Sequence, residues 1–62
     1  MHIKEWEKKA ANGVIEQIKK SIEKNGKLLD CWKYYLKNMS NHMLEVMKVL
    51  DKEFMNSIYE AQ

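Results

Sequence analysis

The sequence predicts an all-α protein, specifically an antiparallel helical hairpin with a long second helix that self-associates into a bundle. Apolar residues recur at steps of three and four through most of the 62 residues, which is the repeat of helices packed along one side. The chain contains no proline, and one glycine-centred break separates two such stretches. A chain of this length forms one domain at most, so residues 1–62 are taken as a single helical unit.

The first helix is expected over about residues 2–24. Placed at 100° per residue, the apolar residues on one side of this helix are Ile3, Ala10, Ala11, Val14, Ile15, Ile18 and Ile22. Trp6 lies at the edge of that stripe. The opposite side is charged, and it includes the acid-before-base pairs Glu5 with Lys9 and Glu16 with Lys20.

A turn is expected over residues 25–27. Gly26 follows Lys24 and Asn25, and glycine is the usual left-handed residue just beyond a helix. A connection this short favours a second helix that runs antiparallel to the first.

The second helix is expected to be continuous over about residues 28–60. Eight apolar residues keep one helical phase and form a predicted self-association seam: Leu29, Trp32, Leu36, Met39, Met43, Val46, Leu50 and Phe54. The alternative is a compact three-helix bundle broken near residues 38–41. In that case Ser40 is an N-cap, and Met39 and Leu44 pack together on either side of it.

A candidate protein-binding surface lies away from this seam. Four apolar or aromatic residues of the predicted long helix point off the seam: Tyr34, Leu44, Met55 and Tyr59. Lysines share that side of the helix, and those assigned to the candidate surface are Lys33, Lys37 and Lys48. A solvated face is the simpler interpretation of the lysines.

Composition argues against catalysis and against cofactor or metal binding. The chain has one cysteine, Cys31, and two histidines, His2 and His42, without the spacing of a metal site. No glycine-rich phosphate loop is present, and the length leaves little room for a pocket of ordinary ligand volume. We therefore expect neither an enzyme, nor a cofactor, nor a bound metal.

The remaining classes involve binding to another macromolecule. We expect a small helical protein–protein interaction module that acts on a larger protein as a regulator, inhibitor or assembly subunit, and that forms homo-oligomers. A nucleic-acid-associated three-helix protein is less favoured because all eleven basic residues are lysine, which reads bases and phosphates less well than arginine. A membrane-surface amphipathic peptide is the third alternative, and nine acidic residues weaken it.

The expected location is the cytoplasm. A single unpaired cysteine suits a reducing compartment. The first residues lack the apolar run of a signal peptide, and no stretch approaches the length of a transmembrane helix.

Overall fold

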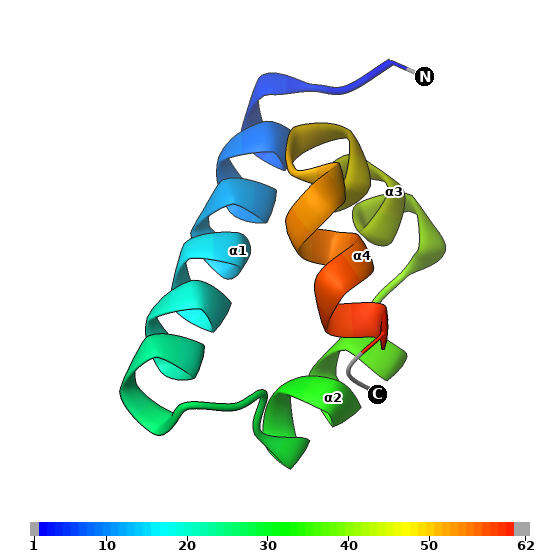
Figure 1. Cartoon of the computed structure of the whole chain (residues 1–62). Helices are drawn as coiled ribbons and strands as arrows, with labels where there is room; N and C mark the ends of the chain where they lie inside the picture. Colours follow the sequence, from blue (N-terminus) through cyan, green and yellow to red (C-terminus); the bar gives the residue numbers. More distant parts are fainter. Residues whose placement is uncertain (1, 61–62) are drawn as a thin grey trace.

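The computed structural model describes residues 2–60 and contains four helices (Figure 1). In chain order they are α1 Glu5–Asn25, α2 Asp30–Lys37, α3 Asn41–Leu50 and α4 Lys52–Glu60. The all-α class is therefore confirmed. The single long helix expected over residues 28–60 is wrong, because α2, α3 and α4 occupy that stretch.

Helix α1 agrees with the expected first helix except at its start. Residues 2–4 precede the helix, and Lys4 has extended backbone angles (φ −80°, ψ 153°). The backbone N–H of Lys4 donates to the Glu7 carboxylate over 3.1 Å. Gly26 ends the helix in the left-handed conformation (φ 72°), as its sequence position predicted, and its N–H donates to the carbonyl of Ile22.

The first break in the expected long helix falls between α2 and α3, where the alternative interpretation placed it. Ser40 is extended (φ −63°, ψ 149°), and its hydroxyl accepts a hydrogen bond from the N–H of Met43 over 3.3 Å. Met39 and Leu44, on either side of this cap, are half-buried against the core. Capping and local apolar packing therefore outweigh the continuity of the apolar repeat.

A second break, which the sequence analysis did not foresee, falls at Asp51. This residue leaves helical geometry (φ −150°, ψ 78°), and its Oδ1 accepts from the N–H of Phe54 in the first turn of α4. Its Oδ2 lies 2.8 Å from the Nζ of Lys19 in α1. Asp51 thus ends α3, caps α4 and ties both to α1, so residues 2–60 form four helices where the alternative expected three.

The core lies where α1 packs on α3 and α3 packs on α4. The buried apolar residues are Ala11, Ile15, Ile18, Leu28, Leu36, Val46, Met47, Met55 and Ile58. Met55, expected to point outward, is instead fully buried. Each break restarts the helical phase, so the direction worked out for one continuous helix does not hold beyond residue 40.

The residues of the predicted seam pack within the chain. Leu36 and Val46 are buried in the core, and Leu29 is half-buried at the start of α2. The other five are half-buried against the core: Trp32, Met39, Met43, Leu50 and Phe54. Folding therefore already covers much of the surface that was expected to pair with another molecule.

Candidate protein-binding site

The largest exposed aromatic surface on neighbouring residues belongs to α2. Tyr34 is 72% exposed and Tyr35 is 47% exposed. Within this eight-residue helix only Leu36 is buried. Because a short helix that contributes one residue to the core leaves most of its circumference in water, the aromatic residues of α2 remain outside.

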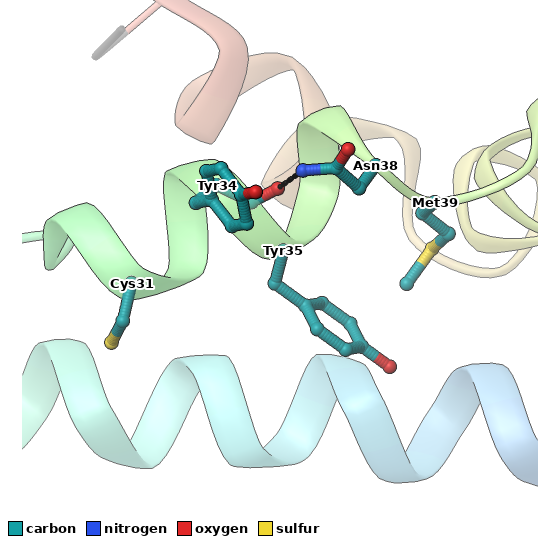
Figure 2. A pocket seen from close by; sticks show the side chains of 5 residues that line it. All are labelled: Cys31, Tyr34, Tyr35, Asn38 and Met39. Carbon is teal, nitrogen blue, oxygen red and sulfur yellow. Dashed lines mark hydrogen bonds between the residues drawn. The ribbon is translucent and has the colours of Figure 1, made fainter.

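These tyrosines border a hollow of about 430 Å³ (Figure 2). The residues that line it, called here the α2 hollow, are Cys31, Tyr34, Tyr35, Asn38 and Met39. None of them is charged. A volume of this size lies toward the lower end of the range for ligand sites, but the hollow is open to solvent and does not enclose a ligand.

Contacts within the chain hold the residues that line the α2 hollow in place. The ring of Tyr35 meets the ring of Trp32 edge to face, with centroids 5.6 Å apart and planes at 83°, and Trp32 packs against the core. The side-chain amide of Asn38 donates to the carbonyl of Tyr34 over 2.8 Å, which closes the end of α2. Such support lowers the conformational entropy that the side chains would lose on binding.

A second hollow, of about 460 Å³, lies between α1 and α2. Its residues are Lys9, Ala10, Gly13, Val14, Gln17, Trp32 and Tyr35. Tyr35 borders both hollows, and in Figure 2 its ring points toward α1. Ala10 has a small side chain and Gly13 has none, so the backbone of α1 lies close to the surface of this second hollow.

The structure does not gather the other predicted binding residues at the α2 hollow. Leu44 is half-buried against the core, and Met55 is inaccessible. Tyr59 packs beside α3, where burial and then the charge of Glu45 raise the pKa of its hydroxyl. The Nζ of Lys48 lies 5.6 Å from the centroid of the Tyr59 ring.

The remaining two candidate lysines belong to α2. The Nζ of Lys33 lies 3.8 Å from the carboxylate of Asp30, and Lys37 is exposed in the last turn of the helix. With the helix broken at residues 38–40, these lysines and Lys48 no longer share one helical face. The lysine stripe expected from the sequence is therefore divided between α2 and α3.

Two contacts made by acidic side chains hold α1 against the second half of the chain, and both shift pKa values. The buried carboxylate of Glu7 accepts from the backbone N–H of Lys4 and contacts the Nε2 of His42, and both contacts lower the pKa of Glu7. Hydrogen bonds from Lys19 and from the N–H of Phe54 lower the pKa of Asp51. The hydrogen bond between Lys19 and Asp51 also raises the pKa of Lys19. These groups fasten helices together, and none of them lines the α2 hollow.

Of the five residues that line the α2 hollow, only Tyr34 is among the candidate binding residues predicted from the sequence. Met39 belongs to the predicted seam, Cys31 was considered only as a metal ligand and Asn38 only as part of the helix break, while Tyr35 was given no role in binding. The usable indication was the stretch from Leu28 to Leu36, which is apolar nearly all round. In a helix this short, such a stretch cannot be enclosed on every side.

The site is that of a small four-helix domain with an uncharged aromatic hollow on its least embedded helix. Among residues 2–60, no group of three or more histidine, cysteine or acidic side chains is placed to hold a metal ion. None of the four helices is long and apolar enough to cross a membrane. Comparisons with protein-family models, with characterised proteins and with solved structures find no match.

Proposed function

We propose that this chain is a small protein–protein interaction module that binds a larger protein through the α2 hollow. The observation that carries the proposal is the exposure of Tyr34 and Tyr35 around a supported, uncharged hollow. Tyrosine supplies a large contact area and a hydroxyl at low entropic cost, and it is enriched among the residues that dominate binding energy. The module would act by occupying a surface, as a regulator, inhibitor or assembly subunit does.

The chemistry of the hollow defines the partner surface that fits it. Because its lining residues are uncharged, a charged side chain entering it would lose hydration without gaining an opposite charge. An apolar side chain, such as leucine or phenylalanine, loses nothing by desolvation and fills the hollow. The partner is thus a protein with a protruding apolar residue, and a reducing compartment such as the cytoplasm would keep Cys31 free to line the hollow.

The test begins with affinity capture from cells that express the chain, followed by binding measurements with the purified partner. Replacing both Tyr34 and Tyr35 by alanine is expected to weaken binding at least tenfold, because aromatic anchors commonly contribute about 2 kcal/mol or more. Val49→Ala is the matched control, since Val49 is 61% exposed but lies on α3. Equal loss in both variants, or in neither, would contradict the proposal.

Cys31 offers an independent check because it is the only cysteine in the chain and is exposed. Alkylation with N-ethylmaleimide places a bulky group in the α2 hollow and is expected to block partner binding. The Cys31→Ser variant should bind normally and should not respond to the reagent. Full binding by the alkylated protein would show that the partner uses another surface.

A further inference from the structure

Helix α1 presents a narrow exposed face that the fold leaves uncovered. At 100° per residue, Trp6, Ala10, Gly13 and Gln17 fall within about 60° of one another. All four are exposed, and Trp6 is exposed to 64%. A side chain built at Gly13 would meet nothing within 4 Å, so the fold itself does not require glycine there. The face combines one large aromatic anchor with small residues that allow a close helix approach.

A row of charges runs along one flank of this face. Glu5, Lys9, Glu16 and Lys20 lie within about 60° of one another on α1, beside the Trp6–Gln17 face. All four are exposed, and the salt bridges within residues 2–60 involve none of them. Their order along the helix is negative, positive, negative, positive.

The spacing of these charges is symmetric and their signs are antisymmetric. The intervals along the chain are four, seven and four residues, centred between Asn12 and Gly13. Reversing the direction of the helix therefore places Lys20 opposite Glu5 and Lys9 opposite Glu16. A second copy of α1, lying antiparallel across a two-fold axis at Gly13, would match each of these four charges with its opposite. Glu23 lies on the same flank but falls opposite residue 2, before the start of α1.

We propose that the chain forms a symmetric homodimer in which the exposed face of α1 packs antiparallel on the same face of a second copy. In a two-fold antiparallel pair the same flank of each helix meets, so Glu5 pairs with the partner's Lys20 and Lys9 pairs with the partner's Glu16. Gly13 lies at the axis, where the absence of a side chain lets the helices approach to the short end of the usual 8–10 Å range. Tyr35 of α2 borders the hollow between α1 and α2 and therefore lies beside this face.

The dimer is expected to be weak and dependent on concentration. Its apolar contacts come mainly from two copies each of Trp6 and Tyr35, and an aromatic side chain buries at most about 150–250 Å². The total lies near the lower end of specific interfaces, about 1,000 Å², a size typical of weak or transient association. The α1 face is distinct from the predicted seam, and its use leaves Cys31 and Tyr34 on the α2 hollow accessible.

Sedimentation equilibrium from low micromolar to near-millimolar concentration tests the proposal. The native chain is expected to pass from monomer to dimer over this range. Lys9→Glu and Glu16→Lys are each expected to weaken association at least tenfold, because each creates two symmetry-related like-charge contacts. Lys8→Glu is the matched control: it makes the same charge change at an exposed position on α1 outside the charged flank and should leave association unchanged.

An equimolar mixture of the two reversed variants gives the sharpest outcome. In a mixed pair the carboxylate introduced at position 9 meets the lysine introduced at position 16, and the unchanged residues at positions 9 and 16 also meet as opposites. Association should therefore return to near the native strength only in the mixture. A native chain that stays monomeric, a control that weakens equally, or a mixture that fails to associate would overturn the dimer and leave the α2 proposal unaffected.

Discussion

Helices α2 and α3 are similar in length, but they are attached to the rest of the molecule very differently. Helix α3 begins at a hydrogen-bonded serine cap and buries Val46 and Met47 completely against α1 and α4. The N-cap of α2, Leu29, makes no side-chain hydrogen bond, and the helix buries only Leu36. Most of the packing therefore comes from α1, α3 and α4, whereas α2 leaves most of its side chains exposed.

The largest expected effect on stability comes from removing the Met47 side chain from the packing of α1, α3 and α4. Met47→Ala removes a fully buried side chain, and such changes cost about 2–5 kcal/mol. Because the core of a chain this small supplies only about 3–5 kcal/mol in total, the variant is expected to be largely unfolded at 25 °C. Urea unfolding followed by far-UV circular dichroism measures the change. Native-like stability would mean that α3 is not the centre of the packing.

Acidification should weaken the same side of the molecule. The pKa values of Glu7 and Asp51 are lower in the folded chain than in the unfolded chain, so the unfolded chain takes up protons first as the pH falls. Their contribution is present in full above about pH 5 and is lost progressively as the pH falls through the lowered pKa values of the folded chain.

Unfolding measured from pH 7 to pH 2 should therefore show falling stability below pH 5. Asp51→Asn keeps a side chain that can cap α4 but removes the charge that pairs with Lys19, so its pH dependence should be shallower. An identical slope in both proteins would mean that Asp51 titrates alike in the folded and unfolded states.

The cap between α2 and α3 predicts a smaller effect. Ser40→Ala removes the acceptor for the N–H of Met43 and should cost about 1 kcal/mol. Ser57→Ala, at an exposed position inside α4, is the matched control and should be neutral or slightly stabilising because alanine favours helix. Thermal unfolding compares the two. Equal midpoints would indicate that the break at residues 38–40 does not depend on this hydrogen bond.

The smallest effect on stability should come from a substitution on the exposed surface of α2. Tyr34→Ala changes a residue that is 72% exposed, so the free energy of unfolding should change by less than about 0.5 kcal/mol. The same urea titration measures it beside Met47→Ala. A loss as large as that of Met47→Ala would show that α2 is as firmly integrated as α3.

The sequence correctly predicted features that depend only on neighbouring residues. Gly26 has the left-handed geometry expected of it, and α1 ends within one residue of the predicted position. Both follow from the preference of glycine for that conformation at the end of a helix.

The second half of the chain shows where local reasoning fails. The apolar repeat keeps its phase across residues 38–41, so periodicity alone favours continuity, whereas the Ser40 cap and the chance to bury Met39 and Leu44 favour a break. The break at Asp51 combines a local capping hydrogen bond from the N–H of Phe54 with an ion pair to Lys19, thirty-two positions earlier in the chain, and no local pattern reports the second of these. The exposure of Tyr35 likewise follows from how few residues α2 places in the core.

The double use of Asp51 has a consequence for the order in which the chain folds. Helix α4 has nine residues, fewer than the 12–15 or so that an isolated helix needs to persist in water. Its first turn is capped by the carboxylate of Asp51, which Lys19 of α1 also holds, so the docking of α1 on α3 fixes the position of this cap. We expect α4 to form after α1 and α3 and to open before them, with its amide hydrogens exchanging ahead of those in the middle of α1.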